Sequence, residues 1–221
     1  AYESCACLVG SEMCIRDSAC FMSSIEALYD LRGCADRIIA SPCEVMAAGF
    51  NYTDILPHLL ADAGTSYDLP GVCSEYYDYY MNRATTKSGC IALTVTGELE
   101  PLAAIVKEIE TKYPGKTYDR ASLQTYEGLD EHVFYDLQGY IEAICDEKDP
   151  LLDKFRAQMG KAFPTESRLH TPSFYSVYGL GDAPNGMHTI EDGKYSGVTT
   201  SAPCERFAPE WAQTSWYRAT H

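Results

Sequence analysis

The sequence has little positive charge and lacks the signals of several large protein classes. Its 221 residues carry 17 Lys and Arg against 32 Asp and Glu, a formal net charge of −15. Because the basic residues are scattered and an acidic surface repels phosphate, we expect no nucleic-acid binding. No run approaches the roughly 18 consecutive apolar residues of a membrane span, so no spanning segment is predicted. The N-terminus also lacks the order of residues typical of a signal peptide, so an exported parent would carry its signal outside this chain.

Motifs of several enzyme and metal-binding classes are missing as well. The absence of Gly-x-Ser-x-Gly, His-Glu-x-x-His and Walker patterns argues against serine hydrolases, zincins and nucleotidases. Ten cysteines are present, but none forms a Cys-x-x-Cys pair and none lies two or three residues from a histidine. A zinc ribbon or finger is therefore not expected, and the irregular spacing argues against a disulfide-stapled mini-fold. The motifs predict no metal site.

The first eighteen residues contain a stretch that resembles a cloning or sequencing scar. Residues 8–17 match one reading frame of a transposase sequencing adapter, and Ser18 fits the incomplete codon that follows. We therefore interpret residues 1–18 as a non-native segment and exclude them from fold prediction. Without them the chain remains acidic and keeps seven cysteines, an odd number, so at least one thiol has no intramolecular partner.

From residue 19 onward, helical and strand patterns alternate. Ser23 and Glu26 are spaced as a capping box ahead of a helix with Ile25 and Leu28 on one face. Apolar spacing predicts further helices, the last of them broken near Pro150, over residues 53–63, 76–83, 98–113 and 135–162. Strands are predicted over residues 37–41, 89–96, 174–178, 187–190 and 195–200.

Two local signals refine this pattern. Either Thr53 or Asp54 is expected to cap the helix over 53–63. Asp192-Gly193 is expected to form a hairpin turn. A strand end, a helix and another strand follow each other closely in residues 19–41, which indicates part of a parallel α/β sheet. The simplest architecture is one α/β domain with a C-terminal extension that contains helices and β-strands.

Cys20 is the main candidate for chemistry. It stands directly ahead of the first predicted helix, at the expected C-terminal end of a preceding strand, where open α/β sheets bind their ligands. A helix N-terminus also favours the thiolate, which is the form that attacks carbonyl carbons. The alternative is a buried structural cysteine, and position alone favours that alternative, because cysteine is among the most buried residue types.

A resemblance to a known family instead favours Cys20 as a nucleophile over a structural cysteine. Residues 19–32, Ala-Cys-Phe-Met-Ser-Ser-Ile-Glu-Ala-Leu-Tyr-Asp-Leu-Arg, and residues 35–41, Ala-Asp-Arg-Ile-Ile-Ala-Ser, resemble the motif around the nucleophile of the clostripain family of cysteine peptidases. Gly49-Phe50-Asn51-Tyr52 is similar to the family's Gly-Trp-Pro-Tyr turn, and residues 196–200 and 216–220 are similar to its closing segments. Residues 19–221 thus resemble the C-terminal part of such a peptidase domain.

The resemblance implies a partial caspase-like α/β/α sandwich and a His/Cys dyad with Cys20 as the nucleophile. The family's histidine lies in a His-Gly motif some tens of residues upstream of the cysteine. Only 19 residues precede Cys20 here and none is histidine, so we expect this fragment to be inactive. The other histidines, each without a neighbouring partner in sequence, are interpreted as solvated or core residues: His58, His132, His170 and His188.

The resemblance also implies the remaining functional expectations. In the clostripain family two acidic positions bind a basic substrate side chain, and they correspond to Ser18 and Ala48 here, so no preference for cleavage after Arg or Lys is predicted. The expected partner is a protein or peptide substrate, and the expected location is secreted or at the cell envelope. No cofactor is predicted, although calcium binding in some relatives leaves that ion as an open candidate. The alternative function is a non-catalytic secreted or cell-surface binding module with the same fold.

Overall fold

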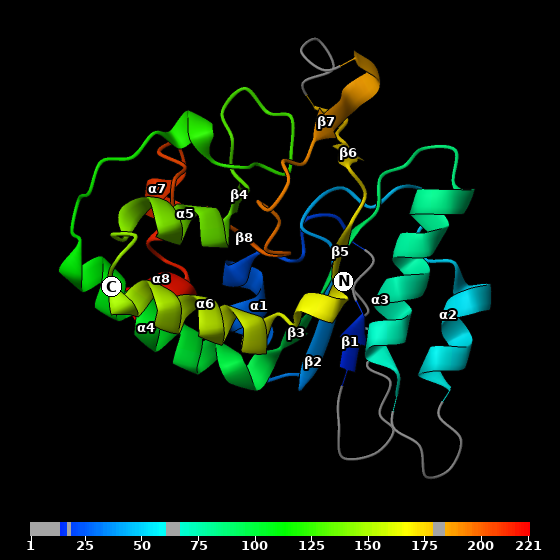
Figure 1. Ribbon diagram of the computed structural model, residues 1–221, viewed down its shortest axis with the longest axis horizontal. Coiled ribbons are helices and arrows are strands. Elements are labelled where there is room, and N and C mark those ends of the chain that lie inside the picture. The colour runs from blue at the N-terminus through cyan, green and yellow to red at the C-terminus, as the bar shows by residue number, and fades with distance from the viewer. Residues whose placement is uncertain (1–13, 17–18, 61–66, 179–183) are drawn as a thin grey trace.

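The computed structural model describes residues 14–16, 19–60, 67–178 and 184–221 and shows a mixed sheet between two helical layers (Figure 1). Four strands form the sheet in the order β1 (Cys14–Arg16), β2 (Arg37–Ala40), β3 (Cys90–Val95) and β5 (Arg168–His170). β1 pairs with β2 in parallel, whereas β2–β3 and β3–β5 are antiparallel. The expected parallel sheet is therefore limited to one strand pair, and the α/β/α arrangement is confirmed.

The larger layer packs on one face of the sheet. It contains α1 (Ile25–Leu31), α4 (Leu99–Lys112), α5 (Leu137–Ile144), α6 (Pro150–Ala162) and α8 (Ser215–Thr220). Ile38 and Ala40 of β2 point into this core, whose members include Leu28, Val106 and Trp216. These residues are almost fully buried, and each large apolar side chain contributes about 1.5–3 kcal/mol of hydrophobic stabilisation.

The smaller layer covers the opposite face. It consists of α2 (Tyr52–Leu59) and α3 (Leu69–Asp78), which continues into a π-helical turn over Tyr79–Arg83. Ile39 points from β2 into this second core, while its neighbours Ile38 and Ala40 point into the first. This alternation is the two-residue period of a strand buried on both faces.

The C-terminal extension adds short elements beyond the sheet (Figure 1). β4 (Tyr135–Asp136) pairs with β8 (Thr199–Thr200), and β6 (Ser173–Tyr175) pairs with β7 (Met187–Thr189). The remaining helices are α7 (Ala208–Trp211) and 3₁₀ turns over Thr96–Glu98, Arg120–Ser122, Thr165–Ser167 and Pro184–Gly186. The predicted extension of helices and strands is thus present.

The predicted caps were wrong in detail. Ser24, not Ser23, is the N-cap of α1, and its hydroxyl accepts from the N–H of Ala27. The Ser23 hydroxyl donates instead to the carbonyl of Gly197 at 2.6 Å. The Glu26 carboxylate accepts from the indole N–H of Trp211 rather than closing a capping box. Tertiary partners therefore outcompeted local capping at both positions.

Other boundaries also moved. The N-cap of α2 is Asn51 rather than Thr53 or Asp54, and the end predicted for this helix falls on residues 61–66, outside the described residues. α3 begins seven residues before the predicted start at Tyr76, because Asp68 caps it through the N–H of Gly71. Asp192-Gly193 forms a turn, but it joins no hairpin, since β7 pairs with β6 and β8 pairs with β4.

β1 lies within the segment that was excluded from fold prediction. Its backbone pairs in register with β2, with Ile15 opposite Ile38. Residues 14–16 therefore have a defined place at the edge of the sheet. That residues 1–18 are non-native stays a prediction.

Candidate active site

Cys20 lies on a sharp turn between β1 and α1, and its side chain is exposed. The next residue, Phe21, has φ of +62°, a left-handed conformation that costs a side-chain-bearing residue on the order of 1–2 kcal/mol. Two backbone hydrogen bonds hold the reversed chain, from Phe21 N–H to the carbonyl of Cys43 (3.2 Å) and from Ser23 N–H to the carbonyl of Ser41 (3.0 Å). The turn therefore presents the thiol to solvent instead of burying it.

The polar partner of the thiol comes from the loop that follows β2. The backbone N–H of Val45 donates to Sγ of Cys20 at 3.3 Å. A donor at this place stabilises a thiolate more than a thiol, since the anion is the better acceptor. The sequence argument assigned this role to the N-terminus of α1, but the N-cap Ser24 lies four residues beyond Cys20. The described donor is therefore a loop amide.

An aromatic contact fixes the turn from the other side. The ring of Phe21 stacks on the ring of Phe134, with centroids 4.7 Å apart and planes 2° apart. Phe134 belongs to a loop organised by the buried carboxylate of Glu127, which accepts from the N–H groups of Leu129, Val133 and Phe134. The strained turn is thus held by packing against a well-ordered loop.

Glu127 also pairs with His132, whose Nδ1 lies 3.0 Å from its Oε2. This hydrogen bond raises the pKa of His132 above its usual value of 6.5. Burial alone would raise the pKa of Glu127, but the hydrogen bonds from His132 and the backbone outweigh it and lower that pKa below 4.5. Both side chains of the pair are therefore charged between pH 4.5 and pH 6.5.

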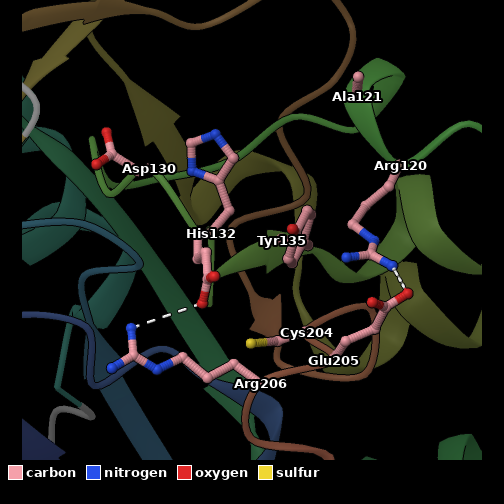
Figure 2. A pocket seen from close by; sticks show the side chains of 9 residues that line it. Arg120, Ala121, Asp130, His132, Tyr135, Cys204, Glu205 and Arg206 are labelled. Carbon is pink, nitrogen blue, oxygen red and sulfur yellow. Dashed lines mark hydrogen bonds and ion pairs between the residues drawn. The ribbon is translucent and has the colours of Figure 1, made fainter.

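His132 lines a pocket of about 800 Å³, shown in Figure 2. Arg120 pairs with Glu205 on one wall, and Arg206 reaches Glu131 across 3.6 Å on another. Cys204 also lines the pocket and is almost fully buried. The lining therefore carries both signs of charge, with Asp130, Glu131 and Glu205 beside Arg120, Arg206 and His132.

Among the described residues, no histidine hydrogen-bonds the Cys20 thiol, which contacts the N–H and the carbonyl of Val45. His58 pairs with Asp68, and His132 pairs with Glu127. Nδ1 of His170 bonds the carbonyl of Thr171, and the ring of His188 stacks on that of Phe174. His58 and His132 thus have carboxylate partners, which lie ten and five residues away in sequence.

Comparisons with known proteins identify the family to which this chain belongs. The sequence profile of the clostripain family matches residues 14–179. The chain belongs to the clostripain family. The resemblance noted around Cys20 is confirmed, and with it the class of the parent protein, a cysteine endopeptidase. No curated protein sequence matches the chain.

Solved clostripain-family structures share the fold. A clostripain from Bacteroides thetaiotaomicron in complex with a peptide inhibitor has 33% identity and a TM-score of 0.81 over 94% of this chain and 86% of that chain. A secreted C11 cysteine protease from the same organism has 33% identity and a TM-score of 0.82, over 94% and 55%. An inactive zymogen C11 protease from Parabacteroides distasonis has 27% identity and a TM-score of 0.78, over 94% and 58%. The chain thus spans little more than half of the latter two proteins.

The family resemblance predicts two acidic positions at Ser18 and Ala48, and neither residue carries a carboxylate. Ser18 lies outside the described residues. Ala48 is exposed on the loop that also carries Val45, next to Gly49, whose φ is +60°. A methyl group at this position provides no charge for a basic substrate side chain. The role of both positions in substrate binding stays a prediction.

Within the described part of the chain, no three His, Cys, Asp or Glu side chains are grouped so as to hold a metal ion. None of the helices in the same residues has the length and apolar character that a membrane crossing needs.

Sequence reasoning missed two contributors to the Cys20 turn. The Val45 N–H is a backbone group, so no residue type signals it. Phe134 is an ordinary aromatic residue in sequence and becomes relevant only through its stacking on Phe21. Neither carries a motif that the primary structure alone would reveal.

Proposed function

We propose that Cys20 is the nucleophile of a clostripain-family endopeptidase. One observation carries the proposal: the thiol is exposed on the turn between β1 and α1 and accepts a hydrogen bond from the Val45 N–H. An exposed thiol with a fixed donor has the access and the anion stabilisation that nucleophilic attack requires. Cys34 is exposed as well, whereas the other described cysteines beyond β1 are buried and lack that access.

In this reaction the thiolate attacks the carbonyl carbon of a peptide bond. A carbon–sulfur bond forms, the carbon–nitrogen bond breaks, and the amine leaves with a proton from an imidazolium. Water then hydrolyses the thioester and restores the thiol. Backbone N–H groups near Cys20 stabilise the oxyanion of each tetrahedral intermediate.

The proposal requires an imidazole that the described residues do not bring to Cys20. We expect it from a His-Gly segment of the parent protein, as the family resemblance implies. The chain by itself should therefore bind peptides without turnover. The substrate is a peptide or protein, and the secreted relative favours export to the envelope or the medium.

The decisive experiment reads the source gene across the Cys20 codon and expresses the protein it encodes. A His-Gly motif upstream, peptide hydrolysis by that protein and loss of hydrolysis in Cys20→Ala would support the peptidase. A gene without the motif, or hydrolysis that survives Cys20→Ala, would overturn the assignment. Peptide binding without hydrolysis would instead support the non-catalytic binding module.

Substrate preference can be tested at the same time. The related clostripain was bound to the inhibitor BTN-VLTK-AOMK, which contains a lysine. If Ala48 occupies the corresponding subsite, Ala48→Asp should raise kcat/KM for Lys and Arg substrates by about tenfold, the effect of one exposed charge pair strengthened by partial desolvation. A neutral substrate serves as the control, and equal changes on both substrates would remove Ala48 from the subsite.

A further inference from the structure

Glu44 lies beside the amide that contacts Cys20 and ties its loop to a distant segment. Its Oε1 accepts two hydrogen bonds at 2.8 Å, from the Ser176 hydroxyl and from the backbone N–H of Val177. These partners are 132 and 133 residues away in sequence. The carboxylate therefore fixes the loop that follows β2 on the segment that follows β6.

The Ser176 hydroxyl is fully used in this arrangement. It accepts from the N–H groups of Gly128 and Tyr178, each at 3.2 Å, so its single proton is left for Glu44. The site is tight: a Cβ on Gly128 would lie 2.3 Å from the carbonyl oxygen of Tyr178. Because a hydroxyl has one donor and two acceptor lone pairs, this network admits one orientation of the Glu44–Ser176 bond.

We propose that Glu44 is a positioning residue for Cys20: by anchoring to Ser176 and Val177, it holds the Val45 N–H against the Cys20 sulfur. This proposal rests on the proposed role of Cys20 as nucleophile. The chain of contacts runs from Ser176 through the Glu44 side chain to its neighbour Val45 and from there to the thiol, with each link a hydrogen bond or a peptide bond. Glu44 itself does not touch the reacting atoms.

The positioning role of Glu44 and its negative charge predict opposite effects on the reactivity of the Cys20 thiol. A carboxylate near a thiol disfavours the thiolate through its charge, so removing the charge should make the thiol more reactive. Removing the anchor should instead release the Val45 N–H and make the thiol less reactive. Tyr76 also interacts electrostatically with Cys20, and burial raises the pKa of Tyr76 well above its usual value, so the tyrosine stays neutral in the assayed range.

The experiment measures alkylation of Cys20 by iodoacetamide in the full 221-residue chain between pH 5 and 10. Cleavage after Arg16 and Arg32 releases a peptide whose only cysteine is Cys20, so mass spectrometry reads this thiol separately from the others. Glu44→Ala should lower the rate at pH 7 by about tenfold and move the midpoint of the pH–rate profile to higher pH, as expected for the loss of one hydrogen bond to a thiolate. Glu44→Gln keeps an acceptor oxygen and should stay within about twofold of the wild type.

Two comparisons separate this outcome from a general loss of structure. Glu108→Ala, on the exposed face of α4, should leave the profile unchanged. Ser176→Ala should shift the profile less than Glu44→Ala, because the Val177 N–H still holds the carboxylate. Faster alkylation in both Glu44 variants, or an unchanged profile in a folded Glu44→Ala protein, would overturn the proposal. Because alkylation requires no turnover, it decides the role of Glu44 even if Cys20→Ala shows the nucleophile assignment to be wrong.

Discussion

Replacing Glu127 with alanine should destabilise the protein by about 4 kcal/mol. The side chain is buried and accepts from three backbone N–H groups at 2.8–3.2 Å and from His132 at 3.0 Å. Each buried donor left without an acceptor costs about 1–3 kcal/mol, and entry of water recovers part of that cost. The same change should loosen the Phe134 ring and so slow the alkylation of Cys20.

The pair of Glu127 and His132 gives this prediction a pH dependence. The pKa of His132 is raised, so its contribution to stability is complete below pH 6.5 and is lost as the pH rises through its folded-state pKa. The pKa of Glu127 is lowered, so its contribution is complete above pH 4.5 and is lost as the pH falls through its folded-state pKa. The pair therefore stabilises the fold most between about pH 4.5 and 6.5.

Urea unfolding of the wild type and of Glu127→Gln at pH 5.5 and pH 8.5 measures this contribution. Because the His132 side chain is 40% exposed, solvent screening limits the pair to about 1 kcal/mol. The wild type should lose about that much more stability than Glu127→Gln between the two pH values. An equal loss in both proteins would refute the role of the pair, and a Glu127→Ala protein as stable as the wild type would refute the loop argument.

Three further predictions concern stability. Gly197→Ala should lower the free energy of unfolding in urea by about 2–4 kcal/mol, because φ at Gly197 is +78° and the new Cβ would lie 2.8 Å from the Cβ of Ala92. The control Gly33→Ala, where a new Cβ would have no atom within 4 Å, should lower it by less than about 1 kcal/mol. Asp136→Asn should cost about 2 kcal/mol by the same assay, since Oδ2 accepts from Tyr126 and twice from Ser196, and an amide nitrogen there accepts none of these bonds. Cys20→Ser should change the unfolding free energy by less than about 0.5 kcal/mol, because the residue is exposed, and a larger effect would assign Cys20 a structural role.

The elements best predicted from sequence are those with a strong local pattern. α4 begins at Leu99 and ends at Lys112, close to the predicted 98–113, because apolar side chains recur at helical spacing and Pro114-Gly115 stops the helix. β2 and β3 also lie within their predicted ranges. β5 was missed because only its pairing with β3 makes the stretch Arg168–His170 a strand.

Local sequence thus determined α4, the central strands β2 and β3 and, through the motif around Cys20, the family. Tertiary structure decided which groups serve that thiol: the Val45 amide reaches it from 25 residues away, and Glu44 is anchored by Ser176 from 132 residues away. The same reason explains why Ser24 and not Ser23 caps α1: the Ser23 hydroxyl donates to the carbonyl of Gly197, which is 174 residues away in sequence. Periodicity and capping act between neighbours in sequence, whereas these hydrogen bonds exist only after the sheet and the C-terminal extension have brought distant segments together.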